Sequence, residues 1–365
     1  MFDSEKQVKS NFLFLEDLNT QIRRNKMIEK LPSPMGRSKK EIIDMLLREE
    51  YGYLPPRPFS VSATLDKRDK RFCAGKAELH KLTLTCCADF GDFSFPIYYV
   101  APKDKKNIPC FIHINFRDNI PDQYQPTEEL VDNGFATLTF CYKDVTSDNG
   151  DFCDGLAGVV YKNGKRRASD CGKIGLWAWA AMAIMDYAQT LPELDKDRIC
   201  VIGHSRLGKT ALLTGALDER FYCAISNNSG CSGASLARHN SGETVEKIVG
   251  TFPYWFCENY YKYVGNEDML PFDQHWLIAA NAPHKVYVAS ARDDLWACPE
   301  NEYMSCVAAS DYYSSCGMVG LVSDDELPRI GSAYHGGDIA YHVREGGHYL
   351  SREDWHRYIE YLMPR

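Results

Sequence analysis

The stretch Gly203-His204-Ser205-Arg206-Leu207-Gly208-Lys209 decides the fold. It follows a short apolar run at residues 198–202 and precedes a helix-like run at residues 210–217. A serine between a buried strand and the start of a helix lies on a sharp turn, which exposes its hydroxyl. The first backbone N–H groups of the helix then point toward any oxyanion that forms there. The stretch therefore predicts a nucleophilic serine on an α/β scaffold.

The composition is that of an ordinary globular enzyme. Of 365 residues, 44% are hydrophobic and 25% are charged, with a net charge of −8 and no block of Lys and Arg. This balance argues against nucleic acid and anionic membrane as partners. No apolar run approaches the roughly 20 residues that span a bilayer. The 14 cysteines include no C-x-x-C pair, which argues against a zinc ribbon or a thioredoxin-type motif. So many cysteines without a pattern fit a reducing compartment better than a secreted protein.

Residues 1–60 are mixed in character and predict an N-terminal arm packed on the main domain. Helical periodicity covers residues 39–51, and a proline-rich run at residues 55–58 ends it. Residues 61–365 are expected to form a single catalytic domain. The first residues show no basic segment followed by an apolar one. We therefore expect a cytoplasmic protein, with a leader removed beforehand as the alternative.

Beyond residue 60, strand-like and helix-like segments alternate. The expected strands cover residues 82–87, 93–100, 109–115, 134–140, 198–202, 221–226, 285–290 and 340–343, and the expected helices cover residues 173–191, 210–217, 299–309 and 352–361. This order predicts the α/β class, with a mostly parallel central sheet and helices on both faces, and together with the serine turn it favours an α/β-hydrolase three-layer sandwich. The polar, glycine-rich residues 144–170 predict a long loop that borders a cleft. Residues 227–269 predict an irregular, aromatic segment.

Ser205 needs a base, and His348 is the first candidate. It follows the last expected strand and precedes the last expected helix, where the catalytic histidine of an α/β-hydrolase lies in chain order. His342 is the runner-up, but it lies inside a strand, where a side chain is more often simply packed. His204 is next to the serine, so its side chain should diverge from the hydroxyl, and we interpret it as structural.

The loop after the penultimate strand offers the third member of a triad. Asp293 and Asp294 follow the strand at residues 285–290. A carboxylate there can reach the second ring nitrogen of the histidine, fix its tautomer and stabilise the imidazolium. Asp294 is the first choice and Asp293 is the second.

Two cations follow the serine, which is unusual at the start of a helix. Arg206 and Lys209 lie on the first turn, where the helix dipole disfavours positive charge. This cost predicts that they hold negative charge, either a developing oxyanion or an acidic substrate. The alternative is that Lys209 points to solvent. Histidines and carboxylates do not cluster at metal-ligand spacing, so no metal or organic cofactor is implied.

The pattern Gly-x-Ser-Arg-x-Gly-Lys is the point at which the chain resembles a known family. It resembles the glucuronoyl esterases, carbohydrate esterase family 15, and more closely the bacterial members. The resemblance runs from about residue 31 to the last helix, and its other motifs are residues 227–233, 241–243 and 294–296 and the terminal His348. Such enzymes cleave esters between 4-O-methyl-glucuronic acid on xylan and lignin alcohols. The resemblance thus implies a small-molecule or oligosaccharide uronate ester as substrate.

The resemblance also implies roles for individual residues. It makes Ser205 the nucleophile and His348 the base. It implies that Arg206 stabilises the oxyanion through its backbone N–H and its guanidinium. The positions that would contact the uronate sugar are Lys209, Glu243 and Trp296. This agrees with the residue chemistry, because a cation can donate to some hydroxyls of a sugar and a carboxylate can accept from others. An indole can cover the apolar edge of the sugar.

Two features depart from the family pattern. Some members carry the triad acid as a glutamate at the position of Asn228, which cannot carry a charge. The resemblance then implies that the acid comes from the loop after the penultimate strand, which favours Asp294. The second departure is the apparent lack of a secretion signal. Because lignin cannot enter a cell, a cytoplasmic form would need a small imported ester.

The leading hypothesis is a serine carboxylic ester hydrolase for esters of (4-O-methyl-)glucuronic acid. The first alternative keeps the fold and the mechanism but removes acetyl groups from acetylated xylo-oligosaccharides. A less favoured alternative is a non-catalytic carbohydrate-binding relative. Neither a nucleic acid nor a membrane is expected as a partner, and nothing in the sequence indicates an oligomeric state.

Overall fold

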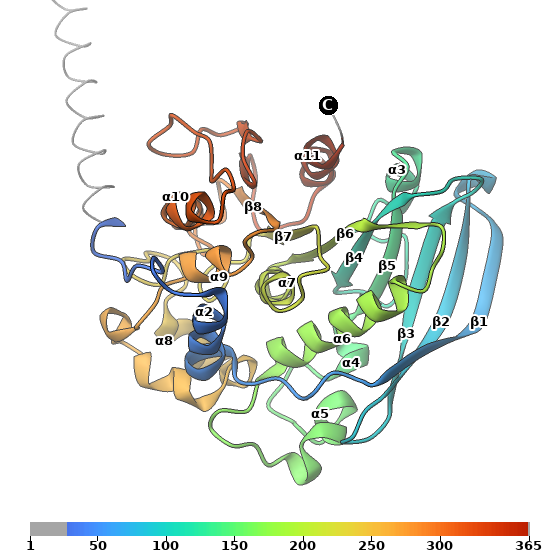
Figure 1. Cartoon of the computed structure of the whole chain (residues 1–365), viewed down its shortest axis with the longest axis horizontal. Helices are drawn as coiled ribbons and strands as arrows, with labels where there is room; N and C mark the ends of the chain where they lie inside the picture. The colour runs from blue at the N-terminus through green and yellow to red at the C-terminus, as the bar shows by residue number, and fades with distance from the viewer. Residues whose placement is uncertain (1–27, 364–365) are drawn as a thin grey trace, which may run out of the picture.

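Ten strands form one mixed sheet in the computed structural model, which describes residues 28–363 (Figure 1). In chain order the strands are β1 (Ser60–Phe72), β2 (Ala77–Cys87), β3 (Phe93–Pro102), β4 (Ile108–Asn115), β5 (Ala136–Cys141), β6 (Leu194–His204), β7 (Cys223–Asn227), β8 (Lys285–Ala291), β9 (Ala333–Tyr334) and β10 (Ile339–Arg344). Their order across the sheet is β1-β2-β3-β5-β4-β6-β7-β8-β10-β9.

Helices connect most of the central strands. The α-helices of the described residues are α2 (Lys39–Leu46), α3 (Thr127–Asp132), α4 (Tyr142–Val145), α5 (Gly155–Val160), α6 (Lys173–Ala188), α7 (Arg206–Leu217), α8 (Val245–Thr251), α9 (His275–Ala279), α10 (Pro299–Ser315) and α11 (Arg352–Leu362). A π-helical turn, Leu47–Tyr51, continues α2, and short 3-10 helices lie between α8 and α9. Among the described residues, no helix combines the length and the apolar character needed to cross a membrane.

The centre of the sheet is parallel and its edges are antiparallel. Strands β5, β4, β6, β7, β8 and β10 pair in parallel. Strand β2 pairs antiparallel with β1 and with β3, β3 pairs antiparallel with β5, and β9 pairs antiparallel with β10. Short connections force antiparallel pairing in β1 to β3, whereas helical crossovers permit the parallel centre. The predicted three-layer α/β sandwich is confirmed, with more antiparallel edge than the sequence indicated.

Alternating side chains of the central strands face two separate cores. In β6, Ile199 and Val201 are buried with residues of α6, α7 and α10 on one face. Cys200 and Ile202 are buried with residues of α11 on the other face. Figure 1 shows these helices on opposite sides of the sheet. A strand buried on both faces reads as a continuous apolar run, which is why its position could be predicted.

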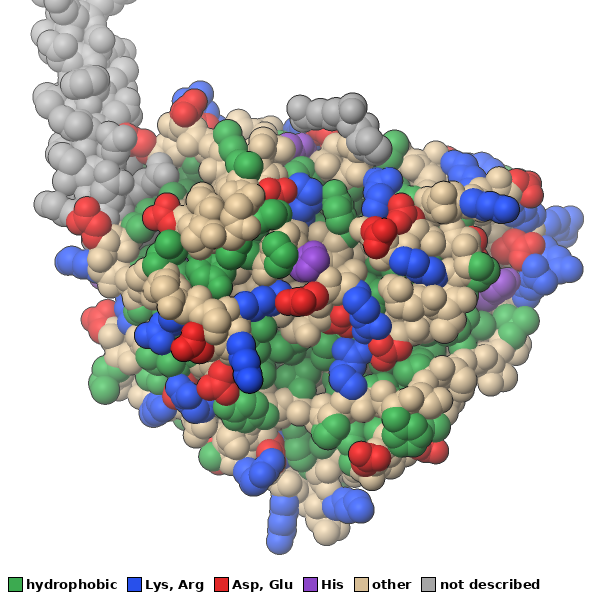
Figure 2. Space-filling view, viewed as in Figure 1, with side chains coloured by type: hydrophobic (Ala, Val, Ile, Leu, Met, Phe, Trp, Pro, Cys, Tyr) green, Lys and Arg blue, Asp and Glu red, His purple; other side chains and the backbone are tan. Residues whose placement is uncertain are grey.

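The irregular segments contain more helix than their sequence indicated. Residues 144–170, expected as a loop, include α5, and residues 227–269 include α8 and several 3-10 turns. Within the predicted arm, Ile42 and Tyr51 are buried in the main core, and the Tyr51 hydroxyl donates to the backbone carbonyl of Ser232 at 2.9 Å. Residues 1–27 of the predicted arm lie outside the described residues. On the face of the molecule seen in Figure 1, Figure 2 shows acidic and basic side chains interspersed.

The parallel centre brings several loops to one edge of the sheet. Strands β6, β7, β8 and β10 are neighbours and run in the same direction. The loops that follow them therefore meet at their carboxyl ends, where α/β sheets bind ligands. Ser205, Asn228, Asp294 and His348 are on these four loops.

Trp355 anchors α11 to the sheet and tests the second core. Its ring is fully buried, lies 5.2 Å from the Phe111 ring, and its indole N–H donates to the Tyr124 carbonyl at 2.8 Å. Trp355→Ala should lower the free energy of unfolding by about 3–5 kcal/mol, because it leaves a large cavity. Denaturant unfolding measures this loss. The matched control is Trp296→Ala, since Trp296 is 51% exposed and should change stability much less; equal losses would contradict this assignment of the core.

Candidate active site

Ser205 sits on a strained turn between β6 and α7. Its φ is 59° and its ψ is −127°, a conformation that a residue with a Cβ rarely adopts. The Ser205 N–H donates to the Asn227 carbonyl at 2.8 Å, which ties the turn to the end of β7. A Cβ on Gly203 would lie 2.0 Å from the Leu207 carbonyl oxygen, so only glycine permits so tight a turn. The strain exposes the serine where a helix begins, as the sequence predicted.

His348 and Asp294 form a direct pair. The His348 Nδ1 lies 2.6 Å from the Asp294 Oδ2, and the carboxylate is buried whereas the imidazole is half-buried. Asn228 Nδ2 donates to the same Oδ2 at 2.9 Å. Burial by itself would raise the pKa of Asp294, but the hydrogen bonds and charge of His348, with Asn228, hold it below its usual range. Asp294 is therefore an anion that orients the ring of His348.

Asp293 points away from this pair. It is exposed and forms an ion pair with Arg292 at 2.8 Å, and that hydrogen bond lowers the pKa of Asp293. Of the two candidate acids, the structure places Asp294 against His348 and leaves Asp293 at the surface.

The two other candidate histidines lie in packed surroundings. His204 is buried, its Nδ1 lies 2.7 Å from Asn227 Oδ1, and its ring centroid is 4.5 Å from that of His348. Burial, with the nearby His348, lowers the pKa of His204 to about 3, so it is a neutral support beneath the His348 ring. His342 is buried in β10 between the Tyr287 hydroxyl and Asp354, both at 2.9 Å.

Arg206 is held by a carboxylate and by aromatic rings. Its Nη1 forms an ion pair with Asp148. The guanidinium carbon lies 4.7 Å from the ring centroid of Trp255 and 5.3 Å from that of Phe252. Asp148 also accepts from the Trp255 indole N–H at 2.8 Å. Asp148 comes from the polar loop that the sequence analysis expected beside a cleft, but the sequence did not single it out.

Lys209 points inward rather than to solvent. Its side chain is 3% exposed, and its ammonium donates to the carbonyls of Ser229 and Cys231 and, at 3.0 Å, to Glu243 Oε2. These three acceptors match the three donors of an ammonium. The solvent-facing alternative for Lys209 is therefore wrong.

Trp296 closes this group at the surface. Its indole N–H donates to Glu243 Oε1 at 3.1 Å, and the Glu243 N–H donates to the Trp296 carbonyl at 2.8 Å. A Cβ on Gly242 would lie 2.4 Å from the carbonyl oxygens of residues 295 and 296, so glycine allows the two loops to meet. Lys247 Nζ lies 5.1 Å from the centre of the Trp296 ring.

One cavity of about 340 Å³ collects these side chains. Its lining residues are Ser205, Arg206, Lys209, Asn228, Ser229, Gly230, Glu243, Phe252, Trp255, Asp294, Trp296, Ala297 and His348. All seven first-choice site residues predicted from the sequence line it, and Asp293 does not. The aromatic wall formed by Phe252 and Trp255 was not predicted, because nothing in residues 227–269 distinguished these two rings from the aromatic residues around them.

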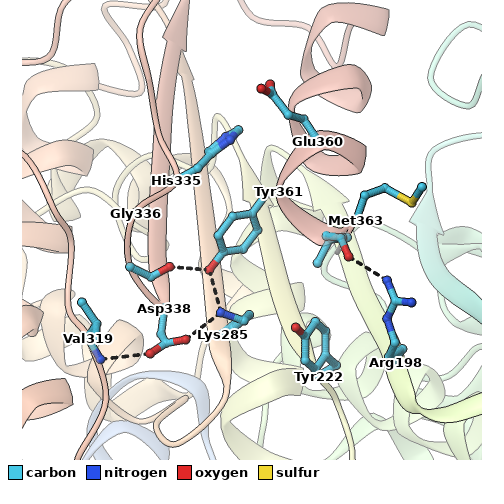
Figure 3. Close-up of a pocket in the computed structure, with 12 residues that line it drawn as sticks. Arg198, Tyr222, Lys285, Val319, His335, Gly336, Asp338, Glu360, Tyr361 and Met363 are labelled. Atoms are coloured by element: carbon cyan, nitrogen blue, oxygen red, sulfur yellow. Dashed lines mark hydrogen bonds and ion pairs between the residues drawn. The ribbon is translucent and has the colours of Figure 1, made fainter. Parts of the chain in front are cut away.

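A larger cavity lies at the opposite ends of the strands and has a different character. It measures about 570 Å³ and is lined by Arg198 of β6, by residues at the amino ends of β7, β8 and β10 and by the end of α11 (Figure 3). Lys285 there pairs with Asp338 at 2.6 Å, and Arg198 donates to the Leu362 carbonyl at 2.7 Å. None of its 12 described lining residues is a serine or a cysteine. Among residues 28–363, no group of three or more His, Cys, Asp and Glu side chains could hold a metal.

A strained serine after a central parallel strand, with a histidine and an aspartate from later strands, defines the α/β-hydrolase class. Comparison with known proteins gives the family. The family model described as glucuronyl esterase, fungi, matches residues 85–317, and the chain belongs to the glucuronoyl esterase family.

Curated relatives and solved structures agree with this assignment. The chain is 38% identical over 236 residues to the carbohydrate esterase MZ0003 from an unknown prokaryotic organism, covering 64% of the chain and 54% of that relative. It is 28% identical over 269 residues to a 4-O-methyl-glucuronoyl methylesterase from Podospora anserina, covering 70% of the chain and 51% of that relative. The chain thus spans about half the length of these two relatives.

Among solved structures, a glucuronoyl esterase from Solibacter usitatus superposes with a TM-score of 0.82 at 28% identity, covering 90% of this chain and 92% of the other. A structure described as a promiscuous CE15 esterase from a marine bacterial metagenome gives a TM-score of 0.80 at 29% identity, with 90% and 91% coverage.

The position of Asp294 predicts its effect on Ser205. In Asp294→Asn the amide cannot stabilise an imidazolium, so the rate at which a fluorophosphonate labels Ser205 should fall on the order of 10³- to 10⁴-fold. Asp293→Asn is the matched control and should label at the rate of the unmodified protein. Equal losses in both variants would contradict the assignment of Asp294.

Proposed function

We propose that this protein is a serine carboxylic ester hydrolase that cleaves esters of glucuronic acid or its 4-O-methyl derivative. The observation that carries the proposal is the single cavity in which Ser205 and the His348–Asp294 pair adjoin Glu243 and Trp296. Ser205 and the His348–Asp294 pair supply acyl-transfer chemistry. Glu243 and Trp296 offer the hydrogen bonds and the apolar surface that a sugar requires. Family membership and the names of the relatives support the same activity.

The proposed reaction proceeds through an acyl-enzyme. His348 takes the proton of Ser205 as the hydroxyl oxygen attacks the ester carbonyl, while Asp294 accepts the Nδ1–H and stabilises the imidazolium. His348 then gives that proton to the departing alcohol. A water molecule, deprotonated by His348, attacks the acyl carbon, and the uronic acid leaves with Ser205 restored.

Arg206 is proposed to hold the oxyanion that forms at each step. As the first residue of α7, its backbone N–H has no partner within the helix and is free to donate. Its guanidinium lines the cavity, and Asp148 and Trp255 restrict where it can lie. A donor fixed before the reaction stabilises the developing charge without a reorganisation cost.

The charges around the cavity suit an ester better than a free acid. Arg206 is compensated by Asp148, and Lys209 is compensated by Glu243. Asp294, beside His348, adds a further negative charge to the lining of the cavity. A neutral uronate ester brings no charge into this site, whereas the carboxylate product is repelled by the anionic Asp294, which favours its release.

The role of Ser205 is tested directly on the proposed substrate. Ser205→Ala should lower the hydrolysis of a benzyl glucuronate ester on the order of 10⁴-fold or more, because the nucleophile is lost. Release of glucuronic acid, followed by chromatography, measures the rate. Undiminished hydrolysis by a folded variant would contradict the proposed mechanism.

The sugar-binding group separates the proposal from the deacetylase alternative. The unmodified protein should show a higher kcat/KM on the glucuronate ester than on an acetylated xylose. Glu243→Gln should raise KM for the glucuronate ester about ten-fold or more, because it removes charge-assisted hydrogen bonds. Its KM for the acetylated sugar should change less. Faster turnover of the acetylated sugar by the unmodified protein would favour the deacetylase.

A further inference from the structure

Glu302 is a fully buried carboxylate near the cavity that the proposed mechanism does not use. It lies on the first turn of α10 and is 0% exposed. In the described part of the chain it makes hydrogen bonds but no ion pair. Burial of an uncompensated carboxylate is costly, so its contacts show what it supports.

Three donors, two from the loop after β7 and one from β8, point at this carboxylate. The Gly230 N–H donates to Oε1 at 2.9 Å, and the Ser229 hydroxyl donates to the same oxygen at 3.4 Å. The Ser290 hydroxyl, near the end of β8, donates to Oε2 at 2.5 Å. Glu302 therefore ties the loop after β7 to the end of β8, on the side of the sheet where Ser205 lies.

The loop that Glu302 holds carries contacts for both halves of the site. Asn228, one residue before Ser229, donates to Asp294. The carbonyl of Ser229 accepts from Lys209, which in turn pairs with Glu243. A shift of this loop would therefore displace both Asp294, beside His348, and Glu243, in the sugar-binding group.

We propose that Glu302 is a positioning residue that sets the triad acid and the sugar-binding group through the loop at residues 228–230. The proposal rests on the function proposed above, and it adds a residue that touches neither the substrate nor the reacting atoms. Contacts of this kind have large effects, because a displacement of about 1 Å in a catalytic group can cost on the order of 100-fold in rate.

The hydrogen bonds of Glu302 accommodate the carboxyl group in either protonation state. All three partners donate to the ionised carboxylate, and a protonated carboxyl can instead donate to the Ser290 hydroxyl, because a hydroxyl also accepts. Burial raises the pKa of Glu302 to about 7, against the opposing effect of the hydrogen bonds from Ser290 and Gly230. The folded protein therefore binds an extra proton between about pH 4.5 and pH 7. The stability that this proton contributes is complete below pH 4.5 and is lost as the pH rises through 7.

Other ionisable groups face Glu302 from several elements. Asp294 raises its pKa through charge repulsion and Lys209 lowers it. Cys306, on the same helix, and Tyr341, on β10, are buried close enough for Glu302 to raise their own pKa values. Of these neighbours, only Asp294 and Lys209 line the cavity.

The test compares Glu302→Gln with the unmodified protein on two esters. Glutamine keeps the shape, but its amide nitrogen cannot accept the hydrogen bonds that one carboxylate oxygen receives. For a glucuronate ester we expect kcat/KM to fall on the order of 10- to 100-fold, with a lower kcat and a higher KM. For phenyl acetate, which has no sugar, only kcat should fall. The matched control is Ser310→Ala on the same helix, whose hydroxyl bonds the Cys306 carbonyl away from the cavity.

Stability measurements separate a positioning role from a general loss of folding. Thermal unfolding between pH 5 and pH 8 should show that the variant loses less stability than the unmodified protein as the pH rises. If Glu302→Gln does not fold, Ser290→Ala removes one partner of the carboxylate and should show the same split between kcat and KM. A folded variant with both constants within two-fold of the unmodified protein would overturn the proposal.

The second ester keeps the two proposals distinguishable. If the unmodified protein hydrolyses phenyl acetate but not the glucuronate ester, the proposed function fails. The positioning role is then still decided by kcat on phenyl acetate and by the rate at which a fluorophosphonate labels Ser205. Unchanged values for Glu302→Gln in both measurements would overturn the positioning role alone.

Discussion

The rest of the site depends on the backbone strain stored at Ser205. A non-glycine residue in this conformation costs about 1–3 kcal/mol, which the surrounding structure must offset. It does so through a strand buried on both faces, a helix packed against it, and the hydrogen bond from the Ser205 N–H to Asn227. The same hydrogen bond joins the serine to the strand whose loop carries Asn228. The carboxyl ends of β6, β7, β8 and β10 therefore position both the strained turn and the rest of the site.

Charge compensation is the second constraint, and it connects segments far apart in the chain. Arg206 and Lys209 are both unfavourable at the start of a helix, and each is paired with a carboxylate from a separate loop. Asp148 precedes the serine by more than fifty residues, and Glu243 follows it by more than thirty. The pairs fix these loops around the cavity, so the two cations help to organise the pocket as well as to line it.

The strands and the serine turn could be predicted because local patterns carry them. Buried parallel strands read as apolar runs, and a serine between such a strand and a helix is typical of a nucleophile on a tight turn. The preference for Asp294 over Asp293 gains little from local pattern, since adjacent residues differ mainly in the direction of their side chains. Glu302 gave no signal either, because a glutamate in the first turn of a helix is ordinarily solvated and favoured by the dipole.

The position of the triad acid and the identity of Asn228 are linked by geometry. Strands β7 and β8 are parallel neighbours, so a carboxylate on the loop after either can approach the same histidine. In this chain the carboxylate is Asp294, and the side chain 2.9 Å from it on the other loop is an amide that donates a hydrogen bond. A second carboxylate at that distance would repel the first and raise the pKa of one of them. An acid on the loop after β8 therefore favours a neutral donor on the loop after β7, and Asn228 meets that requirement.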